Sequence, residues 1–339
     1  MTTLTQPSSI QTKRLSIGYP RKGAGNMLFE NLNLILKKGE FTCFMGANGI
    51  GKSTLIRTLA GLQKPLSGDI LIDDKILSEV HGTDAQSLAR RIAVVLTDRV
   101  SSLNMNVYEL VSYGRYPYLG WGTLMGEEDK KIVQRSIDFV QINHLTHYKI
   151  HELSDGQLQM VMIARALAQD TPIILLDEPT AHLDLNNRLE IMNLLRKLAR
   201  TRSKTILVAT HELDLALQTA DFIWLAGQDR SIVTGMPEDL VLDGSFDEIF
   251  KFKGFDLKTG KVYHEAFQQT SVRVEGNGHN YLWTKNALER CGFSITEDPS
   301  SHKIRIISEG NSSRWIVNDS QQFGSIHELI DHLIAHAGG

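Results

Sequence analysis

The sequence predicts an α/β fold built around a mostly parallel sheet. Short runs that are apolar at every position, such as residues 173–176 and 205–209, alternate with longer segments in which apolar residues recur at helical spacing. Runs of the first kind are typical of strands covered on both faces, as parallel strands are. Because α/β sheets bind ligands at the carboxyl ends of such strands, the residues that follow each run are the candidate site.

The strongest candidate is the segment at residues 42–54, TCFMGANGIGKST. An apolar run predicts a strand at 42–45, glycines at 46, 49 and 51 open a loop, and residues 52–54 begin a helix. The spacing matches G-x-x-x-x-G-K-[ST], in which backbone N–H groups surround phosphates, the lysine reaches them and the hydroxyl binds Mg²⁺. The helix N-terminus adds partial positive charge. We therefore expect residues 46–54 to bind phosphate; the alternative is a glycine-rich turn with a solvated lysine.

The chain on either side of this loop predicts further strands. Short apolar runs between residues 10 and 38, broken by a turn at 20–26, predict antiparallel strands. Tyr19 ends the first of them, either as a simple strand-end aromatic or as a ring that stacks on a base. Residues 68–77 predict a hairpin, and residues 92–96 predict a buried strand that is followed directly by Thr97 and Asp98.

Helical spacing dominates residues 107–156. Helices are predicted at 107–114 and 127–142, and between them lies an aromatic and glycine-rich loop, RYPYLGWGTLMG, at 115–126. That loop is either a packed connector or a groove for a helix of another protein. Ser154 and Gln157 have the spacing of a capping box at the start of a further helix.

Acidic side chains follow the next buried strand. Residues 173–176 lead into Asp177 and Glu178, and after a predicted helix at 187–200 the strand at 205–209 leads into Thr210 and His211. Two carboxylates at the end of a central strand favour a ligand-binding role over a structural one.

The last part of the chain predicts a separate accessory domain. We place the boundary after residue 262, so that the domains span residues 1–262 and 263–339. The sequence of the second domain predicts the order β-α-β-β-β-α and contains neither a phosphate loop nor a catalytic pair. We expect this α+β domain to stabilise a dimer, extend a sheet or regulate the first domain.

Composition limits the possible functions. The chain has 36 Lys+Arg against 39 Asp+Glu, a net charge of −3 that argues against a nucleic-acid partner. Its two cysteines, Cys43 and Cys291, fit a reducing compartment. No segment has the pattern of a signal peptide or the length of a membrane span. We expect a cytoplasmic protein that reaches a membrane only through a partner.

Taken together, the motifs resemble the ATP-binding subunit of ABC transporters, from about residue 10 to about residue 255. The resemblance rests on these segments in this order: Tyr19, GANGIGKST, LSDGQ at 153–157, IILLDE at 173–178, AHLD at 181–184 and His211. Within the family the chain looks most similar to the subunits that power importers of ferric siderophores, haem and vitamin B12, because of ELVSYGRYPYLGWG and LAQDTPIILLDEPT. The resemblance implies a P-loop NTPase with a mixed core sheet, an antiparallel β subdomain and a helical subdomain at about 100–170.

The resemblance also implies roles for single residues. Tyr19 would stack on adenine, Ser53 and Asp177 would position Mg²⁺, Glu178 would act as general base, and His211 would contact the γ-phosphate. The residues implied to hold the phosphates of ATP are Gly46, Ala47, Asn48, Gly49, Gly51, Lys52, Ser53 and Thr54, of which Lys52 also takes part in catalysis.

A second copy of the chain would complete each site in the family. Ser154, Gly156 and Gln157 of one copy would close over the ATP bound to the other in a head-to-tail dimer, and Asp184 would lie across that interface. The implied partners are transmembrane permease subunits and, through them, a solute-binding protein. The implied location is the inner face of the cell membrane, as a peripheral protein.

Two residues depart from the family pattern. Asp155 stands where most members have glycine, and adds a negative charge near an anion site. Thr97 stands where the family has a glutamine that touches Mg²⁺ or the attacking water; its hydroxyl is shorter, so that a bridging water or Asp98 would have to substitute. These departures keep open a regulatory ABC ATPase without productive hydrolysis. A non-transport ABC protein is a separate alternative, but such proteins typically carry two cassettes or a long coiled-coil insertion, and this sequence has neither.

Overall fold

The computed structural model describes two compact units, residues Met1–Lys251 and Phe252–Gly339. It describes residues 8–20, 26–77, 85–97, 104–120, 124–251, 255–257, 261–262, 266, 271–298, 302–309 and 312–336. The boundary that we predicted after residue 262 therefore lies inside the second unit. No helix in the described part of the chain is long and apolar enough to cross a bilayer.

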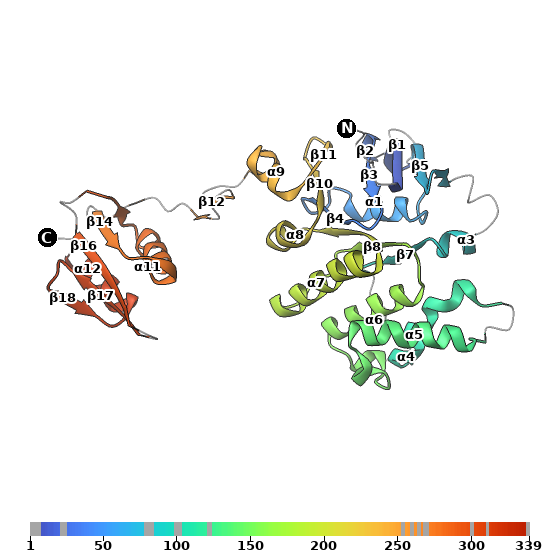
Figure 1. Ribbon diagram of the computed structural model, residues 1–339. Coiled ribbons are helices and arrows are strands. Elements are labelled where there is room, and N and C mark those ends of the chain that lie inside the picture. Colours follow the sequence, from blue (N-terminus) through green and yellow to red (C-terminus); the bar gives the residue numbers. More distant parts are fainter. Residues whose placement is uncertain are drawn as a thin grey trace, which may run out of the picture. The chain divides into compact units, whose positions relative to one another are not determined.

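A six-stranded sheet forms the centre of the first unit (Figure 1). Its strand order is β11-β10-β4-β9-β8-β7, and all neighbours are parallel except β10 and β11. The strands are β4 (Phe41–Gly46), β7 (Ile92–Val95), β8 (Ile173–Asp177), β9 (Thr205–Thr210), β10 (Phe222–Ala226) and β11 (Ile232–Gly235). Every residue of β4, β8 and β9 is buried, as the uninterrupted apolar runs predict.

A second sheet is antiparallel and lies over helix α1 (Lys52–Leu59). Its strands are β1 (Ser8–Tyr19), β2 (Asn26–Leu32), β3 (Ile35–Lys37), β5 (Ser67–Ile72) and β6 (Lys75–Ile76). One core cluster joins the two sheets through α1: Ile17 and Phe29 from the antiparallel sheet, Leu55 from α1, and Phe44 and Leu207 from the central sheet. Helix α1 is thus held on both sides, which fixes the loop before it.

Helices α4 (Val107–Ser112), α5 (Glu127–Val140) and α6 (Asp155–Ala168) lie together as a helical group, apart from the antiparallel sheet (Figure 1). Short 3₁₀ segments connect them: η1 (Tyr113–Tyr118), η2 (Asn143–Leu145) and η3 (Ile150–Glu152). The remaining helices of the first unit are α3 (Ala85–Ala89), α7 (Leu185–Arg202), α8 (Leu213–Thr219), α9 (Pro237–Leu242) and α10 (Ser245–Phe250). The helical group packs on the central sheet through α6 and β7.

The second unit has its own sheet and core. The five-stranded sheet has the order β15-β14-β16-β17-β18, and its core joins Val272, Ile304 and Trp315 to residues of two helices. The elements are β14 (Ser271–Glu275), α11 (Gly278–Arg290), β15 (Ser294–Ile295), β16 (His302–Glu309), β17 (Ser312–Val317), β18 (Gln321–Phe323) and α12 (Ile326–His336). A short pair, β12 (Phe255–Asp256) and β13 (Lys261–Val262), precedes them.

The structure corrects the predicted elements in two places. The loop predicted at 115–126 is helical in its first part, because η1 continues directly from α4 and ends at Tyr118, after Pro117. The second unit has a fourth strand after the helix, β18, which its polar sequence QQF gave no reason to expect. Residues 121–123 of that loop and 21–25 of the predicted turn lie outside the described residues.

The buried indole of Trp315 provides a test of the second core. Its Nε1 donates to the hydroxyl of Thr284, 2.7 Å away, and both side chains are buried. We expect Thr284→Val, which keeps the shape and removes the acceptor, to destabilise the second unit by about 1–3 kcal/mol. Thr296→Val, at a more exposed position, is the control. Denaturant unfolding followed by tryptophan fluorescence measures both, and an equal effect of the two changes would contradict the prediction.

Candidate functional site: a phosphate loop beside an acidic strand end

Parallel pairing brings the predicted site residues to one edge of the central sheet. Met45 of β4 pairs with Thr210 of β9, and Asp177 of β8 pairs with Ala209. Val95 of β7 pairs with Leu176. The ends of β4, β9, β8 and β7 therefore follow one another along the edge, and with them the phosphate loop, His211, the acidic pair and Thr97.

The phosphate loop has the backbone that its glycines predict. Gly49 and Gly51 both have positive φ angles, 77° and 120°, which other residues adopt only with strain. A Cβ atom on Gly51 would also lie 3.0 Å from the Phe29 ring. Helix α1 begins directly after Gly51, so that its unpaired N–H groups and positive end face the loop.

Lys52 lies inside the loop, where it holds the loop together. Its side chain is 6% exposed, and Nζ donates to the carbonyl oxygens of Gly46 at 3.0 Å and Ala47 at 3.3 Å. Nζ also lies 3.3 Å from Oε1 of Glu178. The lysine charge is therefore held inside the loop by oxygens that a bound phosphate would have to replace.

Glu178 is held between two basic groups. Lys52 contacts one carboxylate oxygen, and Nδ1 of His211 lies 2.7 Å from the other. Glu178 has a φ angle of 48°, a left-handed conformation that costs a non-glycine residue about 1–2 kcal/mol. A hydrogen bond from its N–H to the carbonyl of Ala209 fixes this turn at 2.9 Å. The backbone thus turns the carboxylate out of the sheet and toward the loop.

Asp177, one residue earlier, is buried and contacts the start of α1. Its Oδ1 accepts a hydrogen bond from the Ser53 hydroxyl at 3.0 Å, whereas Oδ2 is buried without a hydrogen-bond partner among the described residues. Burial raises the pKa of the Asp177 carboxyl, and the neighbouring Glu178 raises it further, against the opposing effect of Ser53 and of Arg57 and Lys52. The Ser53 hydroxyl and the Asp177 carboxylate, one oxygen of which has no hydrogen bond among the described residues, form a donor set that suits Mg²⁺.

Tyr19 lies next to the loop at the end of β1. Its hydroxyl is 3.1 Å from the hydroxyl of Thr54, and half of the side chain is exposed. The ring is therefore anchored at its polar end and open to a ligand that occupies the loop.

The N-terminus of α6 is capped by its own residues. The Ser154 hydroxyl accepts from the N–H of Gln157 at 3.3 Å, and Oε1 of Gln157 accepts from the N–H of Ser154 at 3.0 Å. Gly156 is buried, and a Cβ atom there would lie 2.9 Å from the amide of Asn187. In the described part of the chain no hydrogen bond joins Ser154 or Gln157 to the loop at 46–54.

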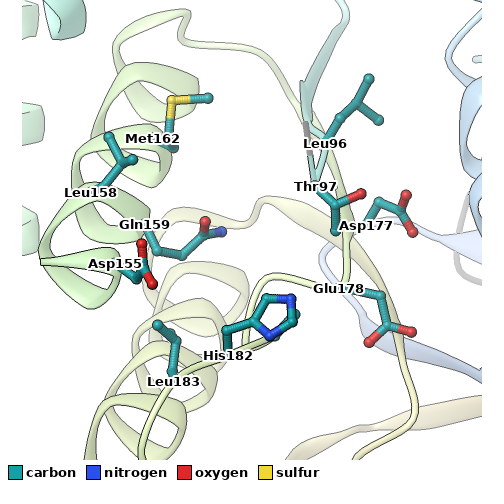
Figure 2. A pocket seen from close by; sticks show the side chains of 11 residues that line it. Leu96, Thr97, Asp155, Leu158, Gln159, Met162, Asp177, Glu178, His182 and Leu183 are labelled. Atoms are coloured by element: carbon teal, nitrogen blue, oxygen red, sulfur yellow. The ribbon is translucent and has the colours of Figure 1, made fainter. Parts of the chain in front are cut away.

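A pocket separates α6 from the acidic strand end (Figure 2). Figure 2 shows α6 residues on one wall, Thr97, Asp177 and Glu178 on the other, and His182 and Leu183 between them. The α6 wall consists of Asp155, Leu158, Gln159 and Met162. Both departures from the family pattern, Thr97 and Asp155, thus line one pocket with the acidic pair. Asp98 lies outside the described residues.

The arrangement defines a nucleotide-hydrolysing α/β protein, and similarity to known proteins specifies its class. The ABC transporter family model matches residues 29–181, and the model of the iron ABC transporter C-terminal domain matches residues 268–334. The chain is 38% identical over 246 residues to the petrobactin import ATP-binding protein FpuD of Bacillus anthracis, which covers 72% of this chain and 87% of FpuD. It is 31% identical over 244 residues to the iron(3+)-hydroxamate import ATP-binding protein FhuC of Bacillus subtilis, covering 72% and 88%.

Solved structures agree with these relatives. An inward-facing metal-chelate type ABC transporter matches with a TM-score of 0.62 at 26% identity, over 72% of this chain and 89% of that one. A dimeric ABC cassette in a post-hydrolysis state with ADP and phosphate matches with a TM-score of 0.58 at 30% identity, over 67% and 98%. The chain belongs to the ATP-binding proteins of the ABC transporter family. It is an ABC-type ATPase that binds nucleotide, and the P-loop fold predicted from its motifs is confirmed.

The structure brings together the predicted residues of one half-site. Their contacts form two groups: Ser53 donates to Asp177, and Glu178 contacts both Lys52 and His211. The sequence did not point to Asn187, which donates to both carboxylate oxygens of Asp184 and packs on Gly156, nor to Gln159 and His182 in the pocket. Asparagine three residues after a capping aspartate is the signal that could have identified Asn187.

The raised pKa of Asp177 predicts that its ionised carboxylate lowers the stability of the folded chain, although the proposed reaction needs it. The folded chain binds the carboxyl proton more tightly than the unfolded chain, so ionisation lowers the free energy of unfolding as the pH rises above about 4. We expect Asp177→Asn to raise the melting temperature at pH 7 by roughly 2–4 °C, the effect of about 1 kcal/mol in a domain of this size, and to abolish ATP hydrolysis.

The gain from Asp177→Asn is expected to disappear as the pH falls below the ordinary aspartate pKa of about 4, where both the folded and the unfolded chain carry the proton. Calorimetric melting of both proteins across this range measures it. Asp69→Asn, which also removes one carboxylate but lies at an exposed position of β5, is the control and is expected to leave the melting temperature unchanged. A gain independent of pH would show that the charge of Asp177 is not its cause.

Proposed function

We propose that this chain is the ATP-hydrolysing subunit that powers an ABC importer of a metal chelate, in the class of ferric siderophores, haem or cobalamin. One observation carries the catalytic part: the Glu178 carboxylate lies between Lys52 and His211, directly beside Ser53 and Asp177. The substrate class is supported by the relatives that import petrobactin and iron-hydroxamate, and by the iron-transporter domain that matches residues 268–334.

In the proposed reaction the loop residues at 46–54 hold the phosphates of ATP, and Tyr19 stacks on its base. A γ-phosphate competes with Glu178 and with the carbonyls of Gly46 and Ala47 for Lys52. When Lys52 turns to the phosphate, the oxygen of Glu178 that it contacted becomes free to accept a proton from the attacking water. His211 keeps the other oxygen in place and so orients the base.

Mg²⁺ belongs to the proposal because the donor set fits it. Ser53 and Asp177 would hold the ion, and Oδ2 of Asp177 would gain the partner that it otherwise lacks. When bound, Mg²⁺ neutralises the charge that develops on the phosphoryl oxygens. Thr97 lies in the same pocket, and we propose that it reaches the ion only through a bridging water.

A homodimer completes the proposed site. Ser154, Gly156 and Gln157 stand at the N-terminus of α6, where the helix end favours an anion. The ATP of a partner copy would supply that anion, and Asp184 would lie across the interface. Asp155 adds a negative charge to the same end, so we propose that it weakens closure of the dimer and keeps turnover slow until the membrane partner assists.

We propose that segment η1 contacts the permease. Through the permease the ATPase would reach a solute-binding protein and would be held at the inner face of the membrane. Arg115 is buried and fixes η1: it donates to Asp129 and to the Ala168 carbonyl, both at 2.9 Å, and its guanidinium lies 3.9 Å from the Tyr118 ring centroid. By contrast Tyr113 and Tyr116 are 54% and 64% exposed. Exposed aromatics on a rigid support are typical of protein-binding surfaces.

We expect Glu178→Gln to lower the rate of ATP hydrolysis by about 10²–10⁴ because it removes the general base. ATP binding is expected to persist, since the loop is unchanged. Phosphate release and fluorescent-nucleotide binding measure the two properties separately. Glu190→Gln, an exposed position on α7, is the control and is expected to hydrolyse ATP at the wild-type rate. Equal, negligible rates for wild type and Glu178→Gln would favour a regulatory ABC protein instead.

We expect Tyr116→Ser to weaken association with the permease by about tenfold, because it removes the more exposed of the two ring anchors. Tyr148→Ser is the matched control, since Tyr148 is 52% exposed but lies outside η1. Titration of the detergent-solubilised permease with labelled ATPase measures the affinity. Equal affinities for both variants would place the contact elsewhere on the chain.

A further inference from the structure

The sheet of the second unit has one face that its own helices do not cover. Side chains alternate across a strand, and Val272, Ile304, Trp315 and Val317 point to the face that packs against α11 and α12. The residues between them must point to the opposite side. This open face consists of Arg273 and Glu275 on β14, Lys303, Arg305 and Ile307 on β16, and Arg314 and Ile316 on β17.

The open face is positively charged in a chain whose net charge is −3. The side chains that the structure describes on it comprise four basic ones and one acidic one, and Asp319 in the following turn contributes a second carboxylate. Glu275 pairs with Arg273 at 3.3 Å and with Lys303 at 3.2 Å. Asp319 pairs with Arg305 at 2.8 Å. Among the side chains of this face that the structure describes, Arg314 has no ionic partner and the basic groups outnumber the acidic ones by two.

The strand register arranges this face as a checkerboard. Arg305 lies directly opposite Ile316, and Ile307 lies directly opposite Arg314. Facing residues on adjacent strands are about 5 Å apart, and residues two apart on one strand about 7 Å. Two guanidinium groups and two half-buried isoleucines therefore alternate within an area the size of one small molecule.

We infer that the open face binds an aromatic anion: a ring with adjacent oxyanion groups, such as a catecholate or salicylate, alone or as ligand of a ferric ion. Guanidinium groups stack on aromatic rings and bind paired oxygens bidentately, and the isoleucines offer apolar contact to the ring. A second copy of this face would bring like charges together, which opposes dimerisation through it. The ferric form rests on the proposed import of a metal chelate; the free anion does not.

The test uses the full chain and 2,3-dihydroxybenzoate, offered alone and as its 3:1 ferric complex, with binding measured by calorimetry. We expect saturable binding that Arg314→Gln and Arg305→Gln each weaken about tenfold or more. Lys285→Gln is the matched control, because it also removes one cation but lies on α11, the covered side of the sheet. Binding of the free anion, of the ferric complex or of both shows which of these two forms the face takes as its ligand.

Several results would overturn the inference. Saturable binding could be absent, or Arg314→Gln could bind with the wild-type affinity. Lys285→Gln could lose as much affinity as Arg314→Gln. Inorganic phosphate could compete as well as the aromatic anion does. Retention on anionic vesicles that Arg314→Gln abolishes would assign the face to a membrane surface instead. Thermal melting shows whether each variant is folded. Lys52→Ala, which disables the ATP site, is expected to bind the anion normally, so failure of the proposed ATPase function and failure of this inference are distinguishable.

Discussion

The parallel pairing of β4, β9 and β8 is the constraint on which the site depends. Each strand ends at the same edge, so residues more than a hundred positions apart meet without any loop having to span the distance. Lys52 follows β4, His211 follows β9 and Glu178 follows β8. The carboxylate between the two basic groups is therefore a result of strand order, and a change in register would remove it even if every residue remained.

The antiparallel sheet serves the same site from the opposite side of α1. Its core residues pack on α1, and α1 begins at Lys52. The position of the phosphate loop therefore depends on a sheet that also contributes Tyr19 to the site. Gly51 shows how close this packing is, because the ring of Phe29 leaves no room for a Cβ atom. The apolar core and the ligand site are thus one structure: loosening the first moves the second.

Local sequence signals predicted most of the helices and strands, and the phosphate loop of the site. The phosphate loop, the capping box at Ser154 and the buried strands are each encoded within a few consecutive residues, and each is present. Features that depend on distant partners were not predictable. Arg115 is buried because Asp129 and the Ala168 carbonyl receive its donors, which its own neighbours in sequence do not indicate. Strand β18 exists because β17 offers an edge to pair with, since QQF has little strand preference of its own.

The acidic pair shows why the site is held so firmly. A buried Asp177 beside Glu178 opposes folding at neutral pH, since burial and a neighbouring negative charge both disfavour its ionised form. A positive φ at Glu178 adds backbone strain. Both costs fall on the two residues that face the phosphate loop, and the surrounding core must offset them. Binding of a cation and a polyphosphate would relieve the electrostatic part, so the unfavourable ionisation of Asp177 favours ligand binding. A cation would meet Asp177 where it already lies, whereas Lys52 would have to leave Glu178 and the loop carbonyls before it could contact a phosphate.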